Sequence, residues 1–239
     1  MPSPVPSPVP SRRGVDAVAL PDLPHAPPGW NRARTALAGA SPVMARIIAE
    51  AREDVLVPRG DPFQTLARSI VGQQISVQAA ASVWARFEVA CRGPVVPERV
   101  RRMRMTTLRG CGLSERKGEY LKDLAGHFTT GALDPSGWGA MDDEAVIEAL
   151  VDVRGIGRWT AEMFLIFNLL RPDVWPLDDI GLLRAVGVHW HADPAAAMRA
   201  RALKATRAEA AAIGEGLRPW RSVATWYLWR TLDPVPVAY

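Results

Sequence analysis

The sequence has little cysteine and no long apolar run. Cys91 and Cys111 are its only cysteines, and neither has a Cys or His neighbour at the spacing of metal ligands. This excludes a four-cysteine iron–sulfur cluster and a disulfide framework. No apolar run approaches the ~20 residues of a membrane-spanning helix, and no signal-peptide pattern is present. We therefore expect a cytoplasmic protein without a membrane partner.

Lysine is also scarce. Lys117, Lys122 and Lys204 are the only lysines beside 26 arginines, so few amines could form a Schiff base. The formal net charge is +4 and the pI is about 9.5. This balance is compatible with a polyanionic partner, although many basic proteins bind none.

Strand patterns and internal repeats are absent, and proline is concentrated at the start. Residues 1–29 repeat Pro-Ser-Pro-Val-Pro and then scatter further prolines, which predicts a disordered tail that cannot pack a core. Residues 30–239 are long enough to bury a full core. We predict an all-α domain of two packed lobes over this range.

Helix starts are indicated by capping residues. Ser41 and Asp61 each precede a proline, which suits the first position of a helix. Ser76, Ser114 and Asp142 precede further helices. We expect ordered structure to begin near Ser41.

The C-terminal third should also be helical. We expect an alanine-rich helix from Pro194 to Lys204, a capping box formed by Thr206 and Glu209, and a final helix from Pro219 to about Leu232.

The stretch from Leu150 to Gly187 organises the chain. It begins with a helix–turn–helix hairpin over residues 150–170, in which Gly155 and Gly157 allow a tight turn with positive φ. The amides of the turn and of the following first helical turn are available to an anion such as a phosphate. Apolar residues at three- and four-residue spacings predict the inner face of the second helix: Met163, Phe164, Ile166, Phe167 and Leu170.

Three motifs together indicate a protein family more specifically than this hairpin does alone. They are Arg-Gly-Ile-Gly-Arg-Trp-Thr-Ala followed by Pro-Leu-Asp-Asp-Ile-Gly-Leu, the segment Ser69-Ile-Val-Gly-Gln-Gln-Ile-Ser76, and Arg218-Pro-Trp-Arg-Ser222 with Trp229. In this combination the chain resembles the helix–hairpin–helix DNA glycosylase superfamily, and within it the alkylpurine branch of DNA-3-methyladenine glycosylase II type. The resemblance covers about residues 42–232. It implies a monomeric, nucleoid-associated repair enzyme without the leading β lobe of longer relatives.

The resemblance implies that double-stranded DNA containing damaged bases is the partner, and it assigns the contacts. A strand-wedging turn of Gln73, Gln74 and Ile75 would fill the gap left by an extruded nucleotide, although a plain helix break would have the same sequence. Four hairpin residues would bind phosphate: Gly155, Gly157, Arg158 and Thr160.

No cofactor is implied as required. The backbone carbonyls of Val151, Val153 and Ile156 match positions that hold a structural monovalent cation, Na⁺ or K⁺, in the family.

Asp179 matches the catalytic aspartate of the family. A carboxylate near the sugar stabilises the positive charge that develops when an N-glycosidic bond breaks, and it can orient water. Asp178 is then expected to cap the next helix. The alternative is that Asp178 and Asp179 are only an N-terminal capping pair.

The aromatic residues imply a pocket for a cationic base. Trp159, Trp229 and Phe164 match or neighbour pocket positions, whereas Trp220 and Trp226 are expected in the core. Trp159 stands where the lyase branch of the family has a nucleophilic lysine, so the resemblance implies a monofunctional hydrolase. Two alternatives stay open: a uracil or mismatch glycosylase of the same fold, and a non-catalytic DNA-binding module.

Overall fold

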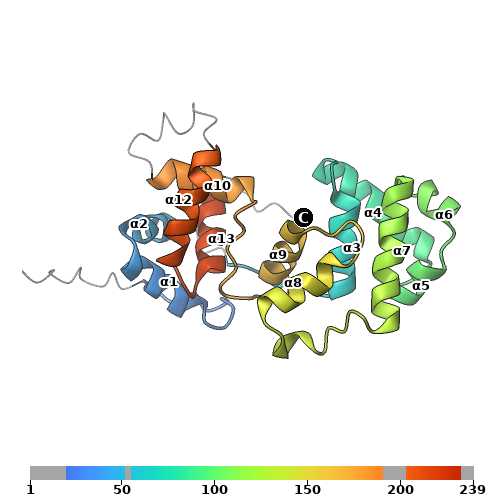
Figure 1. The fold of residues 1–239 in the computed structure, drawn as a ribbon, viewed down its shortest axis with the longest axis horizontal. Coiled ribbons are helices and arrows are strands. Elements are labelled where there is room, and N and C mark those ends of the chain that lie inside the picture. Colours follow the sequence, from blue (N-terminus) through green and yellow to red (C-terminus); the bar gives the residue numbers. More distant parts are fainter. Residues whose placement is uncertain (1–19, 52–54, 191–202, 233–239) are drawn as a thin grey trace, which may run out of the picture.

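The computed structural model describes residues 20–51, 55–190 and 203–232, and every regular element in these ranges is helical. Figure 1 shows two lobes side by side, with α8 (Asp143–Val151) and α9 (Arg158–Phe167) between them. Within the described ranges no helix has the length and apolar character that crossing a bilayer requires. The expectation of an all-α, two-lobed protein is confirmed for this part of the chain.

The first lobe is built around α3 (Pro62–Gly72) and α7 (Glu115–Thr130), which pack against each other. Its other helices are α4 (Val77–Cys91), α5 (Pro97–Arg102) and α6 (Met105–Gly110), and a short 3-10 helix at Trp138–Ala140 leads to α8. Because α3 also contacts α9, the turn between α3 and α4 and the turn between α8 and α9 belong to the same packed unit.

The second lobe is built from helices at the beginning and at the end of the described chain. It contains α1 (Trp30–Ala40), α2 (Pro42–Glu50), α10 (Ile180–Trp190), α12 (Leu203–Glu215) and α13 (Arg221–Leu232). Helix α13 packs against α1, α2 and α10, and the indole N–H of Trp30 donates to the hydroxyl of Tyr227 at 3.3 Å. The α9–α10 connection therefore carries the chain from one lobe back to the other.

The five expected caps are confirmed. The side chains of Ser41, Asp61, Ser76, Ser114 and Asp142 each accept a hydrogen bond from the backbone amide three residues later. This interaction is local, which is why the sequence predicts it well.

Two boundaries differ from the expectation. Residues 20–29 were predicted to belong to the unpacked tail, but Leu23 is buried and α1 already begins at Trp30. The predicted capping box of Thr206 and Glu209 is wrong, because α12 begins at Leu203 and the buried Thr206 lies inside that helix.

The two helices expected near the C-terminus are only partly tested by the structure. Helix α13 begins at Arg221, two residues after the expected start. Most of the alanine-rich helix expected from Pro194 to Lys204, like residues 1–19 of the expected tail, lies outside the described residues.

Candidate active site

Asp179 lies at the N-terminus of α10, where the α9–α10 connection enters the second lobe. Its Oδ1 accepts the backbone N–H of Leu182 at 2.6 Å, the geometry of an N-cap. The expectation that Asp178 caps this helix is therefore wrong; Asp178 instead forms an ion pair with Arg207. Asp179 takes the cap because its amide closes a turn onto the Pro176 carbonyl, which directs the carboxylate over the first turn of α10.

Two tryptophans from different helices also bind this carboxylate. The indole N–H of Trp159 on α9 donates to Oδ2 at 3.0 Å, and that of Trp229 on α13 donates to Oδ1 at 2.8 Å. Gly181 leaves room for this contact, since a Cβ there would lie 3.1 Å from Trp229 Nε1 and 3.0 Å from Asp179 Oδ1. The carboxylate is thus fixed between the two lobes by three N–H donors.

An aromatic wall continues from Trp229. Its ring stacks on Phe167 with the centroids 5.7 Å apart and the planes at 7°, and the guanidinium carbon of Arg59 lies 4.5 Å from the Phe167 centroid. Trp159 is 42 % exposed although its indole N–H is bound, so its ring remains available as a stacking surface. Trp159, Trp229 and Phe167 therefore form the aromatic surroundings of Asp179.

Phe164 was expected in this pocket, and that expectation is wrong. It is only 2 % exposed and packs edge-on against Trp138, with the centroids 5.2 Å apart. Phe167, three residues later on the same helix, has the place beside Trp229. Trp226 is buried, as expected, while Trp220 is partly buried and packs against the core.

The hairpin turn has one glycine that requires a left-handed conformation. Gly155 has φ 87°, and a Cβ there would lie 2.5 Å from Cγ of Tyr120. Gly157 has φ −95°, so the expected positive φ at this position is wrong. It is the N-cap of α9 and provides no side chain to cap the first amides of that helix. These amides remain suited to an anion.

Arg158 was expected to bind phosphate, but its guanidinium already forms ion pairs with two glutamates. Its guanidinium donates to Glu144, including an Nη1–Oε2 contact of 2.8 Å, and to Glu162 at 3.1 Å. The hydrogen bond from Arg158 lowers the pKa of Glu144, whereas burial raises the pKa of Glu162. Thr160 is only 9 % exposed. The side chains of Arg158 and Thr160 are therefore poorly placed for phosphate, and of the expected groups only the α9 amides remain suited to an anion.

The three expected wedge residues do not share one orientation. Gln73 turns toward the hairpin, where its Nε2 donates to the carbonyl of Gly155 at 2.7 Å. Gln74 is exposed with φ 59°, and Ile75 is 40 % exposed. Gln73 therefore anchors the turn, and Gln74 and Ile75 are the members that project from it.

The expected cation-binding carbonyls lie at the end of α8 and in the α8–α9 turn. The Val153 carbonyl accepts the N–H of Ile156 at 3.1 Å, which leaves it a second lone pair. Val151, the last residue of α8, is 43 % exposed.

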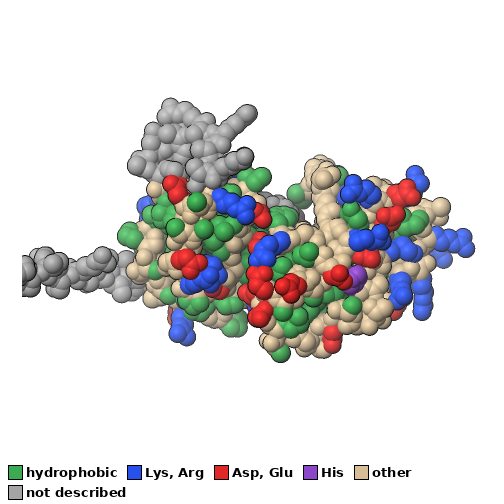
Figure 2. Space-filling view, viewed as in Figure 1, with side chains coloured by type: hydrophobic (Ala, Val, Ile, Leu, Met, Phe, Trp, Pro, Cys, Tyr) green, Lys and Arg blue, Asp and Glu red, His purple; other side chains and the backbone are tan. Residues whose placement is uncertain are grey.

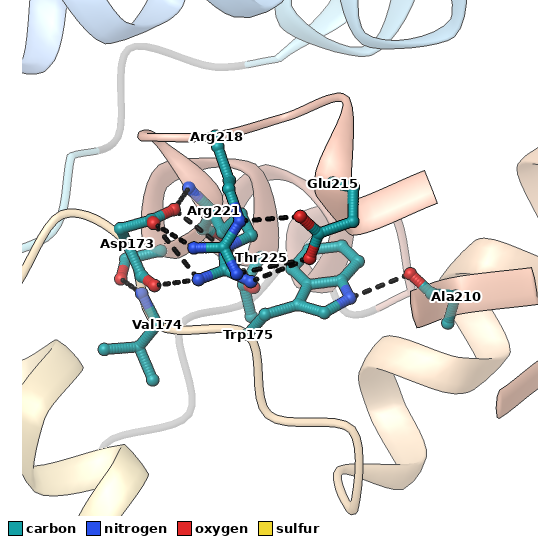
Figure 3. Close-up of polar contacts among 9 residues, drawn as sticks. Asp173, Val174, Trp175, Ala210, Glu215, Arg218, Arg221 and Thr225 are labelled. Carbon is teal, nitrogen blue, oxygen red and sulfur yellow. Dashed lines mark hydrogen bonds and ion pairs between the residues drawn. The ribbon is translucent and has the colours of Figure 1, made fainter. Parts of the chain in front are cut away.

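A group of ion pairs fixes the α9–α10 connection to the start of α13 (Figure 3). Asp173 accepts from Arg218 at 2.9 Å and from Arg221 at 2.7 Å, and Ser222 Oγ accepts the N–H of Val174 at 2.9 Å. The Arg218–Ser222 motif therefore acts on the site from a distance: it holds the segment that leads to Asp179 against the helix that carries Trp229.

The chain is similar to known proteins over most of its length. The profile of the HhH-GPD superfamily, described as base excision DNA repair proteins, matches residues 67–208. DNA-3-methyladenine glycosylase 1 of Schizosaccharomyces pombe is 33 % identical over 192 residues, which are 79 % of this chain and 80 % of that protein.

Two solved structures share the fold. The crystal structure of a DNA-3-methyladenine glycosidase from Bacillus halodurans superposes with a TM-score of 0.75 and 31 % identity, over 84 % of this chain and 89 % of that one. The 3-methyladenine DNA glycosylase of Schizosaccharomyces pombe in complex with abasic DNA gives a TM-score of 0.66 and 29 % identity, over 84 % and 96 % of the two chains. The protein belongs to the HhH-GPD superfamily of base excision DNA repair proteins.

Proposed function

We propose that this protein is a monofunctional DNA glycosylase that extrudes alkylated purines, such as 3-methyladenine and 7-methylguanine, from duplex DNA and hydrolyses the N-glycosidic bond. The observation that carries the proposal is the Asp179 carboxylate held by the indole N–H groups of Trp159 and Trp229. The names of the relatives support the substrate class, and the abasic DNA bound by one of them is the product that such a reaction leaves.

Binding to DNA would use the α3–α4 turn and the α8–α9 turn. Amides of the α8–α9 turn and the first turn of α9 would bind a backbone phosphate, and Gln74 and Ile75 would enter the stack as the nucleotide leaves. On the face drawn in Figure 2, Lys and Arg side chains are frequent at the end of the molecule that contains α4 to α7, with some Asp and Glu among them, and Asp and Glu gather near the middle of the molecule. The flanking duplex is expected to follow the basic end.

Asp179 would then stabilise the breaking bond. Cleavage develops positive charge on the sugar, and a fixed carboxylate nearby stabilises this charge without having to reorganise. The three N–H donors use three of the roughly four acceptor positions of a carboxylate, and the described contacts leave the fourth on Oδ2. That position can face the sugar or orient the attacking water.

An alkylated purine suits the aromatic surroundings because methylation at N3 or N7 makes the base cationic. A cation against an indole face gains about 0.5–2 kcal/mol. The same charge weakens the glycosidic bond, so that little acid assistance is required.

The absence of lyase activity is part of the proposal. Two lysine side chains are described, and both are engaged: Lys117 Nζ donates to the carbonyls of Val71 and Gln73, and Lys122 Nζ to those of Arg101 and Met103. With Trp159 beside Asp179, the nucleophile would be water and not an amine. The proposed location is cytoplasmic, at the nucleoid in a bacterium, where the DNA substrate lies.

A monovalent cation at the carbonyls of Val151, Val153 and Ile156 is also proposed. Their position within six residues, from the end of α8 through the turn that precedes the α9 amides, supports it. Such an ion, when bound, would supply positive charge beside the phosphate, and the protein requires no other cofactor under this proposal.

Release of bases from defined duplexes tests the proposal. Duplexes containing 7-methylguanine, uracil or 8-oxoguanine should be incubated with the protein and the free bases separated. We expect 7-methylguanine to be released and the strand to remain intact until it is treated with alkali. Release of uracil alone would favour a uracil glycosylase, and binding without release from any duplex would favour a non-catalytic module; either result would overturn the proposal.

A further inference from the structure

Helix α7 reaches the wedge turn through a lysine. Lys117 Nζ donates to the carbonyl of Val71 at 2.8 Å and to that of Gln73 at 2.6 Å. These carbonyls belong to the last turn and the C-cap of α3, where backbone acceptors lack partners inside the helix. The lysine therefore holds the exact segment from which Gln74 and Ile75 project.

The same helix reaches the hairpin through Tyr120, one turn after Lys117. The Tyr120 ring packs against Gly155, leaving no space for a Cβ, and its hydroxyl accepts from Arg116 at 3.0 Å. The amide of Gln73 completes the circuit, because it donates to the Gly155 carbonyl at 2.7 Å. Wedge turn, hairpin and α7 are thus joined in a closed ring of contacts.

We propose that Lys117 and Gln73 are positioning residues that join the wedge turn to the hairpin, so that gripping the phosphate and extruding the nucleotide act as one rigid unit. This inference rests on the proposed function. Extrusion must overcome the stacking and pairing of a nucleotide. Phosphate contacts at the hairpin can help to drive extrusion only if the wedge turn cannot move away from the DNA while the hairpin stays in place. A ring of short bonds between the two turns provides that stiffness.

The chain contains a matched control for Lys117. Lys122 lies on the same helix, is half-buried in the same way, and donates to the carbonyls of Arg101 and Met103 at 2.9 and 2.8 Å, at the end of α5. Lys122→Met removes the same kind of contact from a helix end that carries no wedge. A loss seen in Lys117→Met and not in Lys122→Met therefore reports on the wedge turn.

Extrusion can be measured without cleavage in an Asp179→Asn background. 2-Aminopurine placed beside 7-methylguanine in a duplex becomes fluorescent when the stack opens, and anisotropy on undamaged duplex reports phosphate binding. We expect Lys117→Met to lower the extrusion equilibrium about tenfold or more, since two hydrogen bonds from a charged group are lost. Affinity for undamaged duplex should change less, and Lys122→Met should match its parent in both readouts.

A second variant covers the case in which Lys117→Met does not fold. Gln73→Ala leaves the lysine in place and removes only the bond between wedge and hairpin, and it should also lower the fluorescence rise. Excision by both variants in the native Asp179 background should recover on a duplex in which the lesion is unpaired in a bulge, because that nucleotide needs little extrusion.

Two failures are distinguishable. If the Asp179→Asn parent gives no fluorescence rise, the proposed function fails. If the parent gives a rise, and Lys117→Met and Gln73→Ala give the same rise as Lys122→Met, the inference is overturned while the proposed function stands.

Discussion

Gly155→Ala should destabilise the hairpin, and the free-energy cost can be worked out from the structure. Gly155 has φ 87°, and a new Cβ would lie 2.5 Å from Cγ and 2.6 Å from Cε2 of Tyr120. The left-handed conformation costs an L-residue about 1–2 kcal/mol. Forcing a methyl group against the ring adds about 1–3 kcal/mol. The free energy of unfolding should therefore fall by about 2–5 kcal/mol if the turn keeps its shape.

Gly157→Ala is the control within the same turn. Its φ of −95° is open to any residue, and no heavy atom lies within 4 Å of the added Cβ. We expect the free energy of unfolding to stay within about 0.5 kcal/mol of the native value. Affinity for duplex DNA should nevertheless decrease, because the methyl group would stand beside the α9 amides that are proposed to bind phosphate.

Urea unfolding followed by circular dichroism and anisotropy with undamaged duplex would separate the two effects. A double-mutant cycle of Gly155→Ala with Tyr120→Ala should show a coupling of about 1–3 kcal/mol, since removing the ring relieves the contact and leaves the backbone cost. Equal stability of Gly155→Ala and Gly157→Ala would refute the account of the turn.

Three further predictions concern the pocket, the nucleophile and His127, which contacts Asp123 on α7 and Asp152 at the end of α8. Trp159→Ala should reduce excision of cationic 7-methylguanine more than that of neutral hypoxanthine, by about 2- to 30-fold, and equal losses in a base-release assay would contradict a cation–π role. Borohydride should trap no covalent complex with alkylated DNA, and a trapped adduct on a denaturing gel would show that an amine attacks the sugar. Burial lowers the pKa of His127, but the contacts with Asp123 and Asp152 outweigh this and raise it overall. Its contribution to stability should be complete below about pH 6.5 and be lost as the pH rises through the raised pKa, and His127→Gln should remove this part of the pH dependence of urea unfolding.

Helix starts were predictable because their causes are local. A side chain that caps the amide three residues later depends on neighbouring residues alone, as at Ser76 and Asp142. Thr206 has the same local pattern, yet α12 extends past it to Leu203 and the side chain is buried. There tertiary packing overrides the local preference.

The partners of Asp179 could not be derived from spacing. Trp159 precedes it by 20 residues and Trp229 follows it by 50, and only the meeting of the two lobes brings these indoles to one carboxylate. The resemblance to the family assigned all three residues, but no local rule indicates which group donates to which oxygen.

The wrong expectation that Phe164 lines the pocket has a similar origin. Phe164 and Phe167 lie on one apolar face, and periodicity does not tell which of them meets Trp138 and which meets Trp229. For Arg158 the sequence did carry a signal, because Glu162 stands at the i+4 position of the same helix. Lys117 and Tyr120 had no local signal, since their contacts with the wedge turn and the hairpin are long-range.

The most direct measurement is single-turnover excision of 7-methylguanine by Asp179→Asn, compared with Asp178→Asn. Asparagine retains the capping oxygen for Leu182 and Trp229 and should preserve the fold, which unfolding measurements would check. We expect excision to fall by about two to four orders of magnitude with little change in DNA affinity. Asp178→Asn removes only an exposed ion pair with Arg207 and should excise as the native protein does. Native excision by Asp179→Asn would contradict the central role of this carboxylate.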